Sequence, residues 1–269
     1  MPEPSDVYSH GHHSSVLRSH RWRTAENSAA YLLPHLRPDQ DLLDVGCGPG
    51  TITLDLAAVL ERGSVTGVDN APDAVRAAQA QAASDGVANV RFAVGTGYAL
   101  DFPDDSFDVV HAHQVLQHLS DPAAALREMR RVCRPGGVVA ARDADYAAMT
   151  WFPEDDGLTR WLDLYRRLAR SNAGEPDAGR RLRSWALAAG FSEVSAGASV
   201  WCFADADDLG WWSGTWAERV TSSSFAVQAR DGGLATDAQL AEIAHAWRAW
   251  SVAPQAWFSV LHGEVICTA

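Results

Sequence analysis

The sequence lacks a long apolar run near its start and has few positive charges. Residues 1–6 are polar and acidic, so we expect neither a signal peptide nor a transmembrane helix there. Lysine and arginine total 22 against 34 aspartates and glutamates, and the net charge is -12. Because phosphate binding needs a basic face, this balance argues against a nucleic acid partner. We expect a cytoplasmic protein that binds neither nucleic acid nor membrane.

The sequence also has little material for a disulfide framework or a metal site. The four cysteines are Cys47, Cys133, Cys202 and Cys267. They are widely spaced without a C-x-x-C pair, which predicts small buried side chains in a reducing compartment, and this interpretation is favoured over a catalytic Cys47. His10, His12 and His13 have no acidic or cysteine partner at ligand spacing. A polar surface turn is therefore favoured over a metal site, and we expect no metal.

Residues 42–51, Leu-Leu-Asp-Val-Gly-Cys-Gly-Pro-Gly-Thr, are the most informative segment. They predict a buried strand, a glycine turn that lets backbone approach a ligand, and a helix whose N-terminus faces that ligand. Adenosine cofactors bind at such turns. The glycines are spaced G-x-G-x-G rather than the G-x-G-x-x-G of dinucleotide sites. The preceding Asp44 suits a ligand with an ammonium group better than a pyrophosphate.

Further motifs follow in a fixed order. Residues 64–69 predict a second strand that ends in Asp69, a carboxylate placed to accept hydrogen bonds from both ribose hydroxyls, and residues 90–94 predict a third. The remaining motifs are F-P-D-D-S-F-D-V-V at 102–110, V-L-Q-H-L-S-D-P at 115–122 and R-P-G-G at 134–137. The series from about 42 to 145 resembles the class I S-adenosylmethionine (SAM) methyltransferases, in the small-molecule, UbiE-like group.

That resemblance implies an α/β, Rossmann-like fold with a seven-stranded, mostly parallel sheet and helical cap insertions. The expected single domain 1–269 comprises an N-terminal helical lid (1–37), a SAM-binding core (38–145), cap insertions (about 146–178 and 205–254) and sheet-completing strands (about 191–203 and 257–268). Ten of the eleven tryptophans follow residue 150. Both insertions have a helical period, and we expect most of these tryptophans to pack the cap onto the sheet.

The resemblance also implies which residues bind SAM. The expected set is Tyr8, Arg23, Asp44, Gly46, Gly48, Asp69, Asn70, Thr96, Gly97, Tyr98 and His113. A helix is expected from about 15 to 36, and its R-T-A-E stretch is similar to one in glycine N-methyltransferase whose arginine binds the methionyl carboxylate. This role falls on Arg23, with Tyr8 in a lid and the backbone carbonyl of His113 near the ammonium. Thr96 replaces the family's usual acid, so we expect adenine recognition to be weaker or to be shared with backbone groups.

The implied reaction transfers a methyl group from SAM to a small, apolar or aromatic acceptor, with S-adenosylhomocysteine (SAH) as product and O- or N-methylation favoured. Bacterial sugar O-methyltransferases have a similar arrangement in which a histidine and a strand-terminal acid deprotonate a hydroxyl. Here these residues are His118 and Asp143. His118 could instead pack beneath the cofactor; His113 is then the second candidate base, and Asp145 or Tyr146 could replace Asp143. A SAM-fold enzyme of rearrangement and a SAM-binding sensor are the alternatives, and the sequence does not indicate an oligomeric state.

Overall fold

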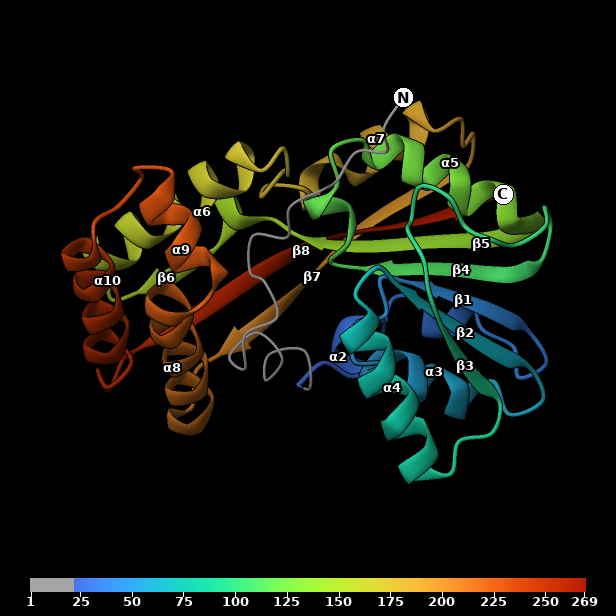
Figure 1. Cartoon of the computed structure of the whole chain (residues 1–269), viewed down its shortest axis with the longest axis horizontal. Coiled ribbons are helices and arrows are strands. Elements are labelled where there is room, and N and C mark those ends of the chain that lie inside the picture. The colour runs from blue at the N-terminus through green and yellow to red at the C-terminus, as the bar shows by residue number, and fades with distance from the viewer. Residues whose placement is uncertain (1–21) are drawn as a thin grey trace.

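An eight-stranded, mostly parallel sheet is the centre of the computed structural model, which describes residues 22–269 (Figure 1). The strands are β1 (Asp41–Val45), β2 (Ser64–Asp69), β3 (Val90–Val94), β4 (Phe107–His113), β5 (Cys133–Ala144), β6 (Thr150–Phe152), β7 (Val194–Phe203) and β8 (Trp257–Thr268). The order is β3-β2-β1-β4-β5-β8-β6, and β7 also pairs with β8. Within the described residues only β8 runs against its neighbours. The predicted Rossmann-like fold is confirmed, and the short β6 adds an eighth strand.

Helices cover both faces of the sheet and also form a cap at one end. The α-helices are α2 (Ala25–Ser28), α3 (Thr51–Val59), α4 (Pro72–Asp85), α5 (Pro122–Val132), α6 (Asp156–Ser171), α7 (Leu182–Ala188), α8 (Ala206–Ser222), α9 (Ser224–Asp231) and α10 (Asp237–Trp250). The 3-10 helices are η1 (Leu33–His35), η2 (Leu116–His118), η3 (Tyr146–Ala148) and η4 (Gly179–Arg181). Helices α2, α3 and α4 pack on one face, and α5 and α7 pack on the other.

Local sequence explains where these elements lie. Central strands carry continuous apolar runs such as Leu42 and Leu43, both of which are fully buried. Helix α4 begins with Pro72 in its first turn and ends before Gly86, whose φ is +68°. Helix α10 begins with a capping box in which Thr236 and Gln239 bond each other's backbone N–H groups. The strands predicted at 64–69 and 90–94 have the expected bounds.

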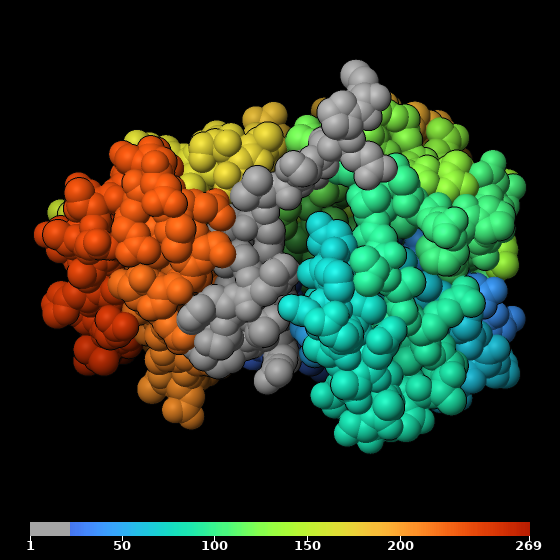
Figure 2. Space-filling view, viewed as in Figure 1, coloured from blue at the N-terminus to red at the C-terminus, as the bar shows by residue number. Residues whose placement is uncertain are grey.

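Helices α6, α8, α9 and α10 form the cap at the end of the long β7–β8 ribbon. Figure 2 shows α8, α9 and α10 of this cap, in orange and red, at the left end of the molecule, and α4, in cyan, in the other half. Its core is aromatic, and it includes Trp161, Trp212, Trp216, Trp247 and Trp250. The packing role expected for most tryptophans is thus confirmed for these residues. The division of the chain into lid, core and cap stays a prediction.

Two expectations from the sequence are wrong. Residues 22–36 do not form one helix: the Thr24 capping box starts α2, which ends at Ser28, and Pro34 lies in the separate turn η1. Cys202 is exposed because it faces away from the buried Trp201 and Phe203 on the edge strand β7. Tyr8 and the histidines 10, 12 and 13 lie outside the described residues.

No helix between residues 22 and 269 is long and apolar enough to cross a bilayer. In the same part of the chain, no group of three histidine, cysteine, aspartate or glutamate side chains is arranged to hold a metal ion.

Candidate active site

The glycine turn after β1 leaves a cradle without side chains. Gly46, Gly48 and Gly50 have φ values of +71°, +53° and +84°, which L-residues rarely adopt. A Cβ on Gly46 would lie 2.3 Å from Cγ2 of Val115, so the turn packs directly against the segment after β4. This cradle at the N-terminus of α3 fits an adenosine cofactor that approaches backbone.

Asp69 fixes the position of the second strand end relative to this turn. Its Oδ2 accepts a hydrogen bond of 2.8 Å from the Gly48 N–H, and its Oδ1 accepts one of 2.9 Å from the Ala71 N–H. Each carboxylate oxygen has two acceptor sites, so the group keeps the capacity to accept from a ribose diol. Asn70, the next residue, is exposed.

Asp44 has two protein partners that the sequence does not reveal. Thr53 Oγ1 donates to its Oδ2 at 2.6 Å, and His111 Nδ1 lies 2.8 Å from its Oδ1. Asp44 and His111 are both buried, and Nε2 of His111 has no hydrogen-bond partner among residues 22–269. The predicted contact of Asp44 with an ammonium group stays a prediction.

Arg23 is the first member of a hydrogen-bonded chain across the strand ends. Its Nη2 donates to Oε1 of Gln114 at 2.6 Å, and Nε2 of Gln114 lies 2.8 Å from Nε2 of His262. The Arg23 guanidinium also lies 5.8 Å from the centre of the Trp201 ring. Neither Gln114 nor His262 was expected in the site, because 148 residues separate them in the sequence.

The loop after β3 carries the residues predicted near adenine. Thr96 forms an isolated bridge with Ala99, and the Tyr98 N–H donates to Thr96 Oγ1 at 3.3 Å. The Tyr98 hydroxyl accepts a hydrogen bond of 3.1 Å from the Asp121 N–H. A Cβ on Gly97 would be 3.4 Å from the side chain of Val45. The structure therefore brings this loop beside the end of β1, and adenine recognition itself stays a prediction.

His118 lies in η2, directly after β4, and a glutamine orients its ring. Oε1 of Gln117 accepts from the Ala144 N–H at 3.3 Å, so its Nε2 is the amide atom 3.0 Å from His118 Nε2. The amide donates, and His118 Nε2 is therefore an acceptor. Burial, and then the nearby Arg23, lower the pKa of His118 to about 3. The imidazole is neutral at physiological pH.

Asp143 is the penultimate residue of β5, and its side chain contacts the backbone of η2. Its Oδ1 accepts from the Gln117 N–H at 3.2 Å, whereas no hydrogen bond between Asp143 and His118 is present in the described part of the chain. Burial raises the pKa of Asp143 to about 8. The catalytic roles of both residues stay predictions, and the structure gives His118 the Gln117 amide as its orienting group.

The other candidate acids and bases have distinct surroundings. His113 is buried, and neither ring nitrogen has a hydrogen-bond partner within residues 22–269; burial, Arg142 and Arg23 lower its pKa. Asp145 is bound by Arg180 Nε at 2.6 Å and by its Nη2 at 2.7 Å. The Tyr146 ring stacks on Tyr165 at 3.9 Å between centres. Asp145 is thus committed to a structural ion pair, whereas His113 remains able to bond a ligand.

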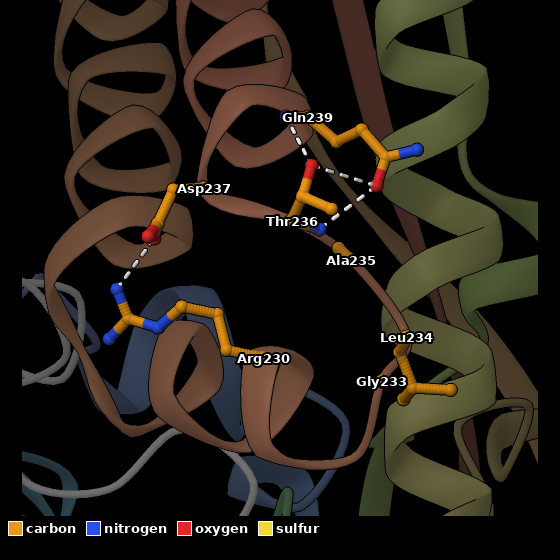
Figure 3. A pocket seen from close by; sticks show the side chains of 7 residues that line it. All are labelled: Arg230, Gly233, Leu234, Ala235, Thr236, Asp237 and Gln239. Carbon is orange, nitrogen blue, oxygen red and sulfur yellow. Dashed lines mark hydrogen bonds and ion pairs between the residues drawn. The ribbon is translucent and has the colours of Figure 1, made fainter.

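A separate pocket of about 550 Å³ lies at the connection between α9 and α10 (Figure 3). It is lined by Arg230, Gly233, Leu234, Ala235, Thr236, Asp237 and Gln239. Arg230 Nη1 donates to Asp237 at 2.8 Å across it. None of these residues belongs to the strand ends described above, so the pocket is not part of the candidate active site.

Comparisons with known proteins agree with this geometry. The model of a methyltransferase domain matches residues 36–190, more than half of the chain. An uncharacterized methyltransferase of Schizosaccharomyces pombe is 35% identical over 278 residues, covering 99% of this chain and 98% of that protein. The probable methyltransferase ltbC of Aspergillus luteorubrus is 29% identical and covers 96% of both chains. The crystal structure of YcgJ from Bacillus subtilis has a TM-score of 0.59 at 21% identity, covers 90% of this chain and 97% of that one, and shows the same fold. The chain belongs to the class I SAM-dependent methyltransferases and is an enzyme of that class.

Proposed function

We propose that the enzyme methylates a hydroxyl or a nitrogen of a small, apolar or aromatic acceptor, and that His118 accepts the proton. SAM supplies a methyl group that its sulfonium already activates. Alignment of the two reactants can contribute about 7–11 kcal/mol to catalysis, so the protein mainly needs to position them and to remove a proton. The orientation of the neutral His118 by Gln117 is the observation that carries the proposal.

In the proposal, the cofactor occupies the glycine cradle. Asp69 accepts from the ribose hydroxyls, and Arg23 pairs with the methionyl carboxylate. Arg23 extends from just before α2 to the residue that follows β4, where Gln114 accepts its hydrogen bond. The same guanidinium lowers the pKa of His118, so it is electrostatically close to the proposed base.

An aromatic wall beside the strand ends supports the proposed acceptor class. The Trp22 ring lies 5.0 Å from Trp201, 5.5 Å from Phe203 and 5.4 Å from Trp211, measured between ring centres. Trp201 in turn lies 5.8 Å from the His113 ring. Large rigid rings next to a few polar groups are typical of sites for planar or lipophilic small molecules.

A weak base is sufficient for this chemistry. As the new bond forms, a hydroxyl becomes an oxonium, which is a strong acid, so a neutral imidazole of low pKa can accept its proton. Nε2 of His118 is the unprotonated nitrogen and accepts from the Gln117 amide, so the acceptor hydroxyl must displace that amide to deliver its proton to Nε2. General base catalysis of this kind contributes a factor of about 10² to 10⁴.

The test is His118→Ala, assayed with methyl-labelled SAM and a panel of naphthols, hydroxyquinolines and aromatic amines. We expect turnover to fall by about 10² or more while SAH affinity stays within a few fold. His245→Ala, at an exposed histidine on α10, is the matched control and should retain activity. Turnover near that of the wild type, or a loss explained by weaker cofactor binding, would exclude His118 as the base.

A further inference from the structure

We infer that Gln114 and His262 are positioning residues that hold the Arg23 guanidinium in the orientation needed to bind the methionyl carboxylate of SAM. This inference rests on the role of Arg23 in the proposed function. It adds two residues from distant parts of the chain, one after β4 and one in β8.

The hydrogen bonds that link Arg23, Gln114 and His262 all have the same donor-to-acceptor direction. Oε1 of Gln114 accepts from Arg23 at 2.6 Å, so the other amide atom, Nε2, donates to Nε2 of His262 at 2.8 Å. His262 must then carry its proton on Nδ1, which donates to the Val260 carbonyl at 3.1 Å. Each member therefore has one allowed orientation, and a fixed backbone carbonyl ends the series.

The backbone of Gln114 adds an independent observation. Its φ is +54°, an uncommon value for a residue other than glycine, asparagine or aspartate. The Gln114 N–H donates to the Arg142 carbonyl at 2.7 Å, which holds this conformation against its strain. A strained backbone conformation persists only where surrounding contacts hold it, and residues in such conformations cluster at functional sites. Here the backbone conformation of Gln114 directs its side-chain amide between Arg23 and His262.

The surroundings of His262 keep it neutral and immobile. Burial, and then Arg142 and Arg23, lower its pKa well below the ordinary value, so its Nε2 stays an acceptor. The Trp201 ring lies 4.3 Å from the His262 ring and 5.8 Å from the Arg23 guanidinium. Trp201 is itself fixed by a hydrogen bond of 2.6 Å from its Nε1 to the Asn27 carbonyl. Arg23 and His262, the two ends of this hydrogen-bonded series, therefore both lie against the Trp201 ring, which is itself held in place.

Calorimetry with two ligands separates positioning from general stability. SAH carries the carboxylate, whereas 5'-methylthioadenosine lacks the entire aminocarboxypropyl part. Gln114→Ala should weaken SAH by about tenfold, as expected for a weakened charge-assisted hydrogen bond, and should leave methylthioadenosine within about twofold. Gln81→Ala, at an exposed glutamine of α4, is the matched control and should change neither affinity.

A double-mutant cycle then tests whether Gln114 acts through Arg23. Arg23→Ala should weaken SAH selectively, and adding Gln114→Ala to it should cause no further loss. His262→Ala should show a smaller but equally selective loss, and His262→Gln should restore most of it because an amide oxygen accepts the same bond. The His262 pair also keeps the inference testable if Gln114→Ala does not fold.

Three results would overturn the inference. If Gln114→Ala weakens both ligands equally, its role is structural. If it weakens SAH by the same factor with and without Arg23, it does not act through the guanidinium. If Arg23→Ala is itself unselective, the assignment of Arg23 in the proposed function fails first, which distinguishes that failure from the other two.

Discussion

The glycine turn and the aromatic cap are held together in different ways. At the turn, both oxygens of Asp69 have defined hydrogen-bond partners, as do both oxygens of Asp44. In the cap, the indole nitrogens of Trp161, Trp212 and Trp247 are buried without a partner among residues 22–269. The turn depends on directional bonds over short distances, whereas the cap depends on the area and shape of packed rings.

The unpaired indoles show how large the packing contribution is. An unsatisfied buried N–H costs about 1–3 kcal/mol. An indole buries about 150–250 Å² of surface, which at about 25 cal/mol per Å² stabilises by more than that cost. In the cap, edge-to-face contacts such as Trp161 on Trp216, at 4.5 Å between centres, add to this area term. The cap should tolerate the loss of an indole N–H better than the loss of ring volume.

The largest expected effect is therefore loss of ring volume in the cap. Trp161→Ala should lower the free energy of unfolding by about 3–5 kcal/mol, measured by chemical denaturation. Trp161→Phe, which keeps much of the area and removes the unpaired N–H, should cost less than half of this. Trp257, which is 38% exposed, gives the matched control Trp257→Ala, for which a much smaller loss is expected. Equal losses at the two tryptophans would mean that the cap is not held by its core.

The second largest effect is expected at the glycine turn, where a substitution should weaken cofactor binding. Gly46→Ala would place a Cβ 2.3 Å from Cγ2 of Val115 at a φ of +71°, so the turn or the Val115 side chain must shift. We expect SAH affinity to fall by about a hundredfold, corresponding to roughly 2.7 kcal/mol. Gly86→Ala has a similar φ of +68° but meets nothing within 4 Å, so it isolates the backbone cost of about 1–2 kcal/mol in stability. Affinity that is unchanged in Gly46→Ala would show that the turn does not form the cofactor cradle.

The smallest effect concerns pH. Because burial raises the pKa of Asp143 from 3.8 to about 8, the folded protein keeps a proton that the unfolded chain loses between these values. The free energy of unfolding should therefore fall as pH rises in this window, by about 1.4 kcal/mol for each pH unit. Asp143→Asn cannot ionise, so its stability relative to the wild type should increase between about pH 6.5 and 7.5. Parallel profiles in thermal unfolding would show that Asp143 ionises normally.

Features set by local sequence could be predicted, and features set by long-range contacts could not. The glycine turn and the strands β2 and β3 follow from apolar runs and turn residues next to one another. The helix predicted up to residue 36 is too long because Thr24 caps a new, short helix and Pro34 lies in the separate turn η1. His111 lies 67 positions from Asp44 and meets it only because β1 pairs with β4. Gln117 occupies a variable position of the 115–122 motif, and Gln114 and His262 lie in no motif, so all three are recognised only by their partners.

The β7–β8 ribbon has a mechanical consequence for the enzyme. β8 has 12 residues, so it extends for about 40 Å without interruption, pairing with β5 in the cofactor half and with β6 beside the cap (Figure 1). Rotation of the cap as a rigid body would break this ladder and its pairing with all ten residues of β7. The shared strand β8 therefore holds the two halves as one rigid unit and opposes a hinge motion between them. We therefore expect an acceptor to enter, and a methylated product to leave, without a hinge motion between the two halves.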